Sequence, residues 1–165
     1  MSWSWHAFWL FLHIYAAIIA FGPTFVFPLV GPMLEKNPQH AQFGFRIFEV
    51  MENRLIIPVA LTMPISGVGL IATTSIDILH TGWLLAGVIL YVIALGIAVF
   101  NQVPATAHAI GILEGAGAGE GGGDGPPPGL QAQVNRARIG GMILSLLLIT
   151  IVILMVTKPG TTAFR

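Results

Sequence analysis

Charged residues divide the chain into four long stretches without Asp, Glu, Lys or Arg, at positions 1–34, 55–76, 78–113 and 139–157. Each stretch holds the ~20 apolar residues that a helix needs to cross the ~30 Å hydrocarbon layer of a membrane. None shows the alternating polar and apolar positions of a membrane β-barrel strand. The pattern predicts an all-α fold, a single-domain integral membrane four-helix bundle over residues 1–165, with spans at 8–30, 55–76, 83–103 and 139–157.

The connections between the spans predict their orientation. The short link 77–82 makes the second and third spans an antiparallel hairpin, and the longer connections 31–54 and 104–138 lie on the opposite side. These two connections hold most of the basic residues, which the positive-inside rule places in the cytoplasm. We therefore expect both termini outside a bacterial inner (plasma) membrane, with four tryptophans near the outer interface. The basic residues of the long connections are Lys36, Arg46, Arg54, Arg136 and Arg138, those of the other side are Lys158 and Arg165, and the tryptophans are Trp3, Trp5, Trp9 and Trp83.

Two connecting segments have a distinct character. In the segment 38–54, Phe43, Ile47 and Val50 share one helical face, which predicts an amphipathic helix on the inner membrane surface before a turn into the second span. The segment 115–129 is rich in Gly and Pro, which predicts a flexible cytoplasmic loop between the third and fourth spans. A phosphate-binding loop is disfavoured there, because no Lys and Ser/Thr pair closes the glycines.

Composition excludes several kinds of function. Only 8% of the residues are charged, and the seven acidic and seven basic side chains cancel. No basic surface is available to attract nucleic acid, so the lipid bilayer and other membrane proteins are the expected partners. The chain has no cysteine, which excludes disulfides, iron–sulfur clusters and thiolate metal sites.

His13 is the strongly polar side chain of the first span, and small residues follow it on the same face. Such a face has two uses. It lets another helix approach closely, with His13 hydrogen-bonded to that helix, or it leaves a flat slot beside the imidazole for haem b. Self-association through small-residue faces is a related possibility. The small residues of the first three spans are Ala16, Ala17, Ala20, Ser66, Gly67, Gly69, Gly82, Ala86 and Gly87.

A haem held by His13 needs a second axial ligand at a similar depth. His6 is too far along the same helix, and His40 and His108 belong to the other side of the membrane. His80, in the short link, is the histidine on the expected side, and methionines are softer candidates. The methionine candidates are Met63, Met142 and Met155, with Met155 best placed by depth.

A second polar group lies at the inner mouth of the bundle, where Glu49, Glu52 and Arg54 precede the second span. Its plain interpretation is interfacial anchoring with a local ion pair. The alternative is a proton entry in which His108 meets Glu52. Pro58 and Pro64 follow within two turns, and each removes a backbone hydrogen bond, so we expect a bend that opens carbonyls to the bundle interior.

Two segments carry a resemblance to a known family, Trp5-His6-Ala7-Phe8-Trp9-Leu10-Phe11-Leu12-His13-Ile14 and Met51-Glu52-Asn53-Arg54-Leu55 running into Pro58. They resemble the CopD-like superfamily of small helical-bundle membrane proteins, which includes uncharacterised integral membrane domains and haem-dependent protoporphyrinogen oxidases. The resemblance to the oxidases implies that His13 binds haem. The segment 25–32 lacks the arginine and histidine that the oxidases carry there, which makes the uncharacterised branch the better match.

These observations predict a small inner-membrane protein that acts as a haem-binding redox component or as an accessory subunit of a respiratory or photosynthetic membrane complex. Two alternatives stay open: an enzyme like the haem-dependent protoporphyrinogen oxidases, and a purely structural membrane subunit without a cofactor. The residues expected at a cofactor are His13, His80, Ala17, Gly67 and Gly87, and those expected to handle protons or pair ions are Glu52, Arg54 and His108.

Overall fold

The computed structural model describes residues 4–74, 76–118 and 127–160, and no strand occurs within these ranges. Two 3₁₀ turns, η1 (Gly22–Phe25) and η2 (Pro38–His40), interrupt the first part of the chain. Two π-helical turns, η3 (Glu52–Ile56) and η4 (Ala98–Gln102), lie inside the longest helices. The α-helices are α1 (Trp5–Phe21), α2 (Phe27–Lys36), α3 (Ala41–Met51), α4 (Ile57–Thr74), α5 (Gly82–Ile97), α6 (Val103–Ala118) and α7 (Leu130–Thr157).

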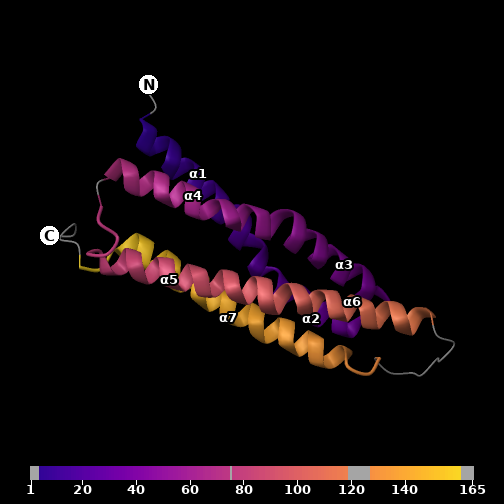
Figure 1. The fold of residues 1–165 in the computed structure, drawn as a ribbon. Helices are drawn as coiled ribbons and strands as arrows, with labels where there is room; N and C mark the ends of the chain where they lie inside the picture. The colour runs from indigo at the N-terminus through magenta and orange to yellow at the C-terminus, as the bar shows by residue number, and fades with distance from the viewer. Residues whose placement is uncertain (1–3, 75, 119–126, 161–165) are drawn as a thin grey trace.

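Four helical runs are long and apolar enough to cross a membrane: Trp5–Gly31, Ala41–Thr74, Gly82–Ala116 and Leu130–Thr157. The predicted all-α membrane bundle is therefore confirmed. The second and third runs have 34 and 35 residues, well beyond the ~20 residues that the hydrocarbon layer requires. The start of α1, the end of α4, the start of α5 and the end of α7 lie at one end of the bundle, called here the terminal end (Figure 1). The end of α6 and the start of α7 lie at the other end, called here the loop end.

The amphipathic segment before the second span is helical, but the predicted turn between them is absent. α3 continues through η3 into α4, because no proline or left-handed residue interrupts the chain from Ala41 to Ile57. Phe43 and Val50 stay exposed, whereas Phe45 is buried where α3 packs on α6, and Gly44 is buried against Leu34 of α2. The extension of α6 beyond the third predicted span provides the surface that α3 covers.

The glycine-rich loop begins later than predicted. α6 continues to Ala118, so residues 115–118 are helical, and residues 119–126 lie outside the described part of the chain. Before α7, Gly129 has φ 84°, a left-handed conformation that glycine adopts without strain. α7 then begins at Leu130, nine residues before the predicted span, because Gln131 to Arg138 continue the same helix.

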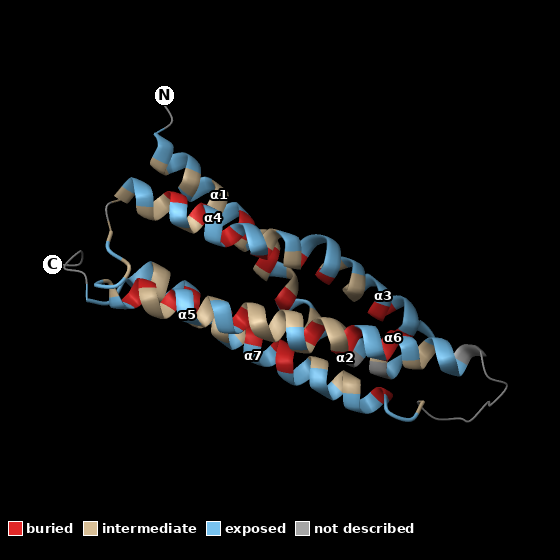
Figure 2. Cartoon of the chain, viewed as in Figure 1, coloured by how far each residue is buried: buried red, intermediate tan, exposed pale blue. Residues whose placement is uncertain are grey.

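The helices pair in two groups at the terminal end and converge at the loop end. α1 packs on α4 and α5 packs on α7, and Figure 1 shows these two pairs diverging toward the termini. The first span crosses from one group to the other. After α1, η1 changes the direction of the chain, and α2 then packs on α7. α3, α6 and the start of α7 meet at the loop end, and the buried residues in Figure 2 follow these contacts.

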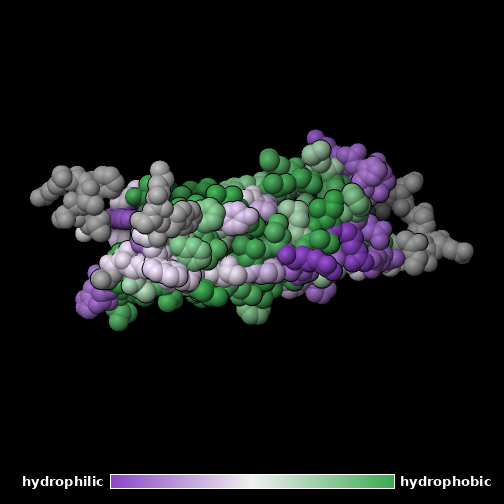
Figure 3. Space-filling model, turned by 90° about the horizontal axis from the view of Figure 1, so that it is seen from above, coloured by the Kyte–Doolittle hydropathy of each residue, from purple (hydrophilic) through white to green (hydrophobic). Residues whose placement is uncertain are grey.

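The outer surface of the bundle agrees with a lipid environment. Many large apolar side chains are exposed, including Ile65 and Leu146 in the middle of α4 and α7. Figure 3 shows hydrophobic residues over much of the middle of one face and hydrophilic residues toward the loop end. Apolar surface of this extent facing outward is expected where hydrocarbon, not water, is the solvent.

Candidate functional site

Both π-helical turns come directly before an X-Pro step, and the two prolines explain them. Pro58 follows η3 by two residues, and Pro104 follows η4 by two residues. Proline lacks an N–H and its ring collides with the carbonyl four residues earlier, and an inserted π turn accommodates this defect. The Ile57 N–H bonds to the Glu52 carbonyl, five residues back, and the wide turns bring Glu52 and Gln102 into the bundle.

Two carbonyls released by prolines accept hydrogen bonds from other helices. Pro64 removes the donor that would bond to the Ala60 carbonyl, and the Tyr91 hydroxyl donates to that oxygen at 2.6 Å. Pro104 does the same for Phe100, whose carbonyl accepts a bond from Arg136 Nη2 at 3.2 Å. The predicted opening of carbonyls to the bundle interior is confirmed at Pro64. A second X-Pro step, Val103-Pro104, is the sequence signal that marks the released carbonyl of Phe100.

Glu52 is the most unusual side chain of the bundle, since it is an acidic residue with only 5% of its surface exposed. Its Oε1 accepts a hydrogen bond from the Thr106 hydroxyl at 3.3 Å. Its Oε2 is buried and has no hydrogen-bond partner within the described residues. A lone carboxylate out of water is costly, so Glu52 requires a bound proton or a positive partner.

Polar side chains of η4 and α7 bond to one another beside Gln102, which lines the same groove as Glu52. Gln102 is buried, and Arg136 Nε donates to Asn101 Oδ1 at 2.8 Å. Gly140 leaves room for them: a Cβ there would lie 2.2 Å from Asn101 Nδ2. About twenty helical residues counted from the terminal end reach η3 through α4, η4 through α5, and the level of Arg138 in α7. These polar residues therefore lie at the end of the ~30 Å hydrocarbon zone.

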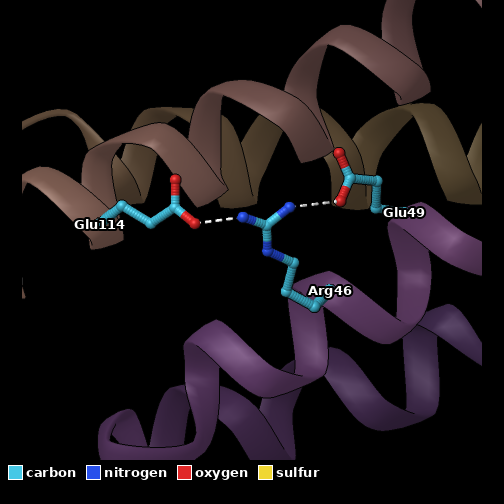
Figure 4. Close-up of polar contacts among 3 residues, drawn as sticks. All are labelled: Arg46, Glu49 and Glu114. Atoms are coloured by element: carbon cyan, nitrogen blue, oxygen red, sulfur yellow. Dashed lines mark hydrogen bonds and ion pairs between the residues drawn. The ribbon is translucent and has the colours of Figure 1, made fainter.

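Arg54 does not form the ion pair considered for it within the described residues. Arg54 is exposed, and no salt bridge to it occurs among the residues that the structure describes. Arg46 provides the charge instead: it pairs with Glu49 at 2.9 Å on its own helix and also with Glu114 of α6 (Figure 4). Arg46 lies one turn before Glu49 and faces α6, a neighbour that local sequence does not reveal.

His108 does not meet Glu52. Its Nδ1 lies 2.6 Å from the carbonyl oxygen of Pro104 on its own helix, and the side chain is exposed. Thr106, two residues earlier, occupies the position facing Glu52, because residues two apart lie on different sides of a helix. Thr106 and Gln102 are the residues of this cluster that motif-based reasoning did not select.

A narrow apolar groove, with a volume of about 50 Å³, adjoins the cluster where α1, η1, α4, α5 and α7 approach one another. Glu52 and Gln102 line it, together with the Tyr91 ring. Its apolar walls include Ala20, Phe21, Ala60, Ala94, Leu144 and Leu148.

His13 lies between α1 and α4, with Nδ1 2.8 Å from Ser66 Oγ. The Ser66 hydroxyl donates its own hydrogen to the Met63 carbonyl at 2.9 Å, so its oxygen accepts from His13. This assigns the proton of the ring to Nδ1 and the lone pair to Nε2. His13 therefore faces another helix of the bundle.

The small residues predicted to form a haem slot do not lie together. Gly67 faces the His13 ring, and Gly69 lies under Trp9, so α1 fills the space beside both glycines, while Ala17 is half-buried on α1. Gly87 belongs to the other pair of helices and faces Met155 of α7. The described residues thus do not fit a haem held between two axial ligands at His13.

His80 lies in the exposed link between α4 and α5, with its side chain 84% exposed. Its Nδ1 lies 2.6 Å from Asp77, and this hydrogen bond lowers the pKa of the Asp77 carboxyl, assisted by the Leu79 N–H. His80 therefore does not face His13. No group of three or more possible His, Asp or Glu metal ligands occurs in the described ranges, and haem binding stays a prediction.

Comparisons with known proteins agree with a membrane protein and specify no activity. No curated protein matches the chain, and no solved structure matches it. Membership in the CopD-like superfamily, a haem cofactor and a partner complex stay predictions from the sequence. The model of a family described as predicted integral membrane protein (DUF2269) matches residues 8–159, and the chain belongs to this family.

Proposed function

We propose that this integral membrane protein is a proton-coupled membrane component in which Glu52 takes up and releases a proton at the helix junction. The observation that carries the proposal is the buried Oε2 atom of Glu52, which has no partner among the described residues. Ionisable residues inside membrane bundles are costly to bury, and those that occur commonly serve ion pathways or proton relays. This role suits a subunit of a larger complex as well as a protein that acts alone.

The surroundings of Glu52 favour the exchange of a proton rather than a permanent ion pair. Arg46 and Arg136 make their bonds elsewhere, to carboxylates of α3 and α6 and to groups of η4. Thr106 donates one hydrogen bond to Glu52, which both protonation states can accept. The π turn at Glu52 adds a further argument, since π turns inside helices occur frequently at functional sites.

Infrared spectroscopy of the purified protein in lipid tests this function. A protonated carboxyl has a C=O stretch distinct from that of a carboxylate, and we expect one that titrates at roughly pH 5–9, the range used in proton transfer. Glu52→Gln should remove this band, Glu52→Asp should retain one, and Glu114→Gln should leave it unchanged. Glu114 is the matched control because it lies on the exposed surface. A Glu52 carboxyl that keeps one protonation state over this range would overturn the proposal.

A further inference from the structure

The π turn η4 is fixed to α7 by hydrogen bonds that run in both directions between Asn101 and Arg136. Arg136 Nε donates to Asn101 Oδ1 at 2.8 Å, and Asn101 Nδ2 donates to the Arg136 carbonyl at 3.4 Å. Arg136 Nη2 also donates to the Phe100 carbonyl at 3.2 Å. Arginine suits this task, because its planar guanidinium holds several donors in one fixed arrangement. These bonds set the position of η4 on α7.

Two glycines of α7 let η4 approach closely enough for these bonds. Gly140 lies one helical turn after Arg136 and so faces the same neighbour. A Cβ at Gly140 would lie 2.2 Å from Asn101 Nδ2 and 2.7 Å from Gln102 Oε1, and a Cβ at Gly141 would lie 3.4 Å from Gln102 Nε2. Alanine at position 140 would therefore displace both amide side chains. Asn101, Arg136 and Gly140 are called here the η4 clamp.

Pro104 by itself does not decide the geometry of this turn. It removes one backbone hydrogen bond, and a helix accommodates that loss either by a kink or by a π turn. In η4 the Val103 N–H bonds to the Ala98 carbonyl, five residues back, which is the π geometry. In this geometry Arg136 reaches the Phe100 carbonyl. The η4 clamp thus favours the π turn over a kinked α-helix.

The geometry of η4 decides which residue of α6 faces Glu52. A π turn contains one residue more than an α-helical turn, and one residue corresponds to about 100° of rotation about the helix axis. Thr106 follows Gln102 by four residues, is 3% exposed, and donates to Glu52 Oε1 at 3.3 Å. If η4 closed to an α-helical turn, α6 would rotate and Thr106 would leave Glu52. Its neighbours Ala105 and Ala107 have no side-chain donor to replace it.

We infer that Asn101, Arg136 and Gly140 are positioning residues for Glu52: by holding η4 as a π turn on α7, they set the rotation of α6 that places Thr106 against the carboxyl group. The inference rests on the proposed proton exchange at Glu52 and deepens it, because it names the residues that control the hydrogen bond of the exchanging group. Among the described residues, that bond comes from Thr106, and the η4 clamp acts on it through the backbone of η4 and α6.

Infrared spectroscopy of the full chain in lipid tests this inference through the C=O stretch of protonated Glu52, identified by its loss in Glu52→Gln. A carbonyl that accepts a hydrogen bond absorbs at a lower wavenumber than a free one, so Thr106→Val, which lacks the donor, should raise the wavenumber of the band. Asn101→Ala and Arg136→Ala should each raise it by a similar amount. Arg136→Lys should also raise it, because lysine keeps the charge but lacks the planar fork of donors. Arg138→Ala is the matched control, exposed on the same helix, and should leave the band unchanged.

The double variant of Thr106→Val with Arg136→Ala separates control of this bond from a general loss of structure. It should shift the band no further than Thr106→Val alone, because both changes act on one hydrogen bond. A band that is unchanged in Asn101→Ala and Arg136→Ala, or shifts that add in the double variant, would overturn the inference. If Arg136→Ala does not fold, Arg136→Lys takes its place in both comparisons.

The outcomes for this inference and for the proposed function are distinct. If the band of the unmodified chain titrates but does not respond to Arg136→Ala or Arg136→Lys, the positioning role is wrong and proton exchange stands. If the band responds to these variants but does not titrate, proton exchange fails and the positioning role stands. If Glu52 is ionised throughout, proton exchange fails, and the carboxylate stretch lost in Glu52→Gln provides the same comparison among the variants.

Discussion

The loop end and the terminal end of the bundle hold their helices together by different means. At the loop end, Phe45, Ala109, Ile110 and Leu130 form a buried apolar cluster between α3, α6 and α7. At the terminal end, the contacts within α1/α4 are small residues and buried polar bonds, such as Gly69 under Trp9 and the bond between His13 and Ser66 described above. One end resembles the core of a soluble domain, and the other resembles a membrane helix pair.

The solvent explains this difference. Beyond the hydrocarbon zone, α6 extends by 16 residues, or roughly 24 Å, so apolar side chains there can be driven together by water. Within hydrocarbon, lipid tails are as apolar as leucine, and helices associate through close packing and polar bonds. The diverging pairs α1/α4 and α5/α7 lie in the second environment, where exposed apolar faces carry no penalty.

The largest expected effect is at the loop end. Phe45→Ala should destabilise the packing of α3 on α6 by about 3–5 kcal/mol, the usual loss for a buried phenylalanine. Amide hydrogen exchange of α3 and α6 in lipid nanodiscs measures this as faster exchange confined to those helices. Phe43→Ala is the control, because Phe43 lies on the same helix and is 70% exposed. Equal changes in both variants would mean that the cluster does not hold the loop end.

The next effect concerns close packing at the terminal end. A Cβ at Gly69 would lie 2.2 Å from the Trp9 ring, and a Cβ at Gly87 would lie 2.7 Å from the methyl group of Met155. Because the indole is rigid and the methionine is flexible, Gly69→Ala should cost about 1–3 kcal/mol and Gly87→Ala less than that. Thermal unfolding in detergent compares the two. Adding Trp9→Leu should rescue Gly69→Ala, and a failure to rescue would place the clash elsewhere.

The smallest effect is that of the polar bond between α1 and α4. His13→Ala and Ser66→Ala should each cost about 1 kcal/mol, and the double variant should lose less than the sum, because both remove the same bond. His13→Gln should be tolerated, since an amide N–H₂ can donate to Ser66 Oγ. Unfolding free energies of the four variants provide the measurement. Fully additive losses would show that the two side chains do not interact.

The sequence alone determined the number of spans, the antiparallel order of the second and third spans, and the position of the carbonyl that Pro64 releases. These features depend on local properties: the length of an apolar run, the length of a link, and the missing N–H of proline. The same reasoning found Glu52 and His13, because a polar residue inside or beside an apolar span is conspicuous. The same reasoning predicted that His13 would face another helix, and the hydrogen bond between His13 and Ser66 of α4 confirms this.

Only the tertiary structure decided which helices pair and which polar groups meet. α5 is apolar on all sides, so no periodic pattern marks the face that packs on α7. For the same reason the sequence did not show that Gly67 and Gly87 belong to different helix pairs. That Thr106 meets Glu52 and that Arg46 meets Glu114 depends on how far α3 and α6 extend beyond the spans. Hydropathy along the chain indicates where a helix passes from lipid to water. The contact between two helices depends instead on their shapes and on hydrogen bonds between residues far apart in the sequence.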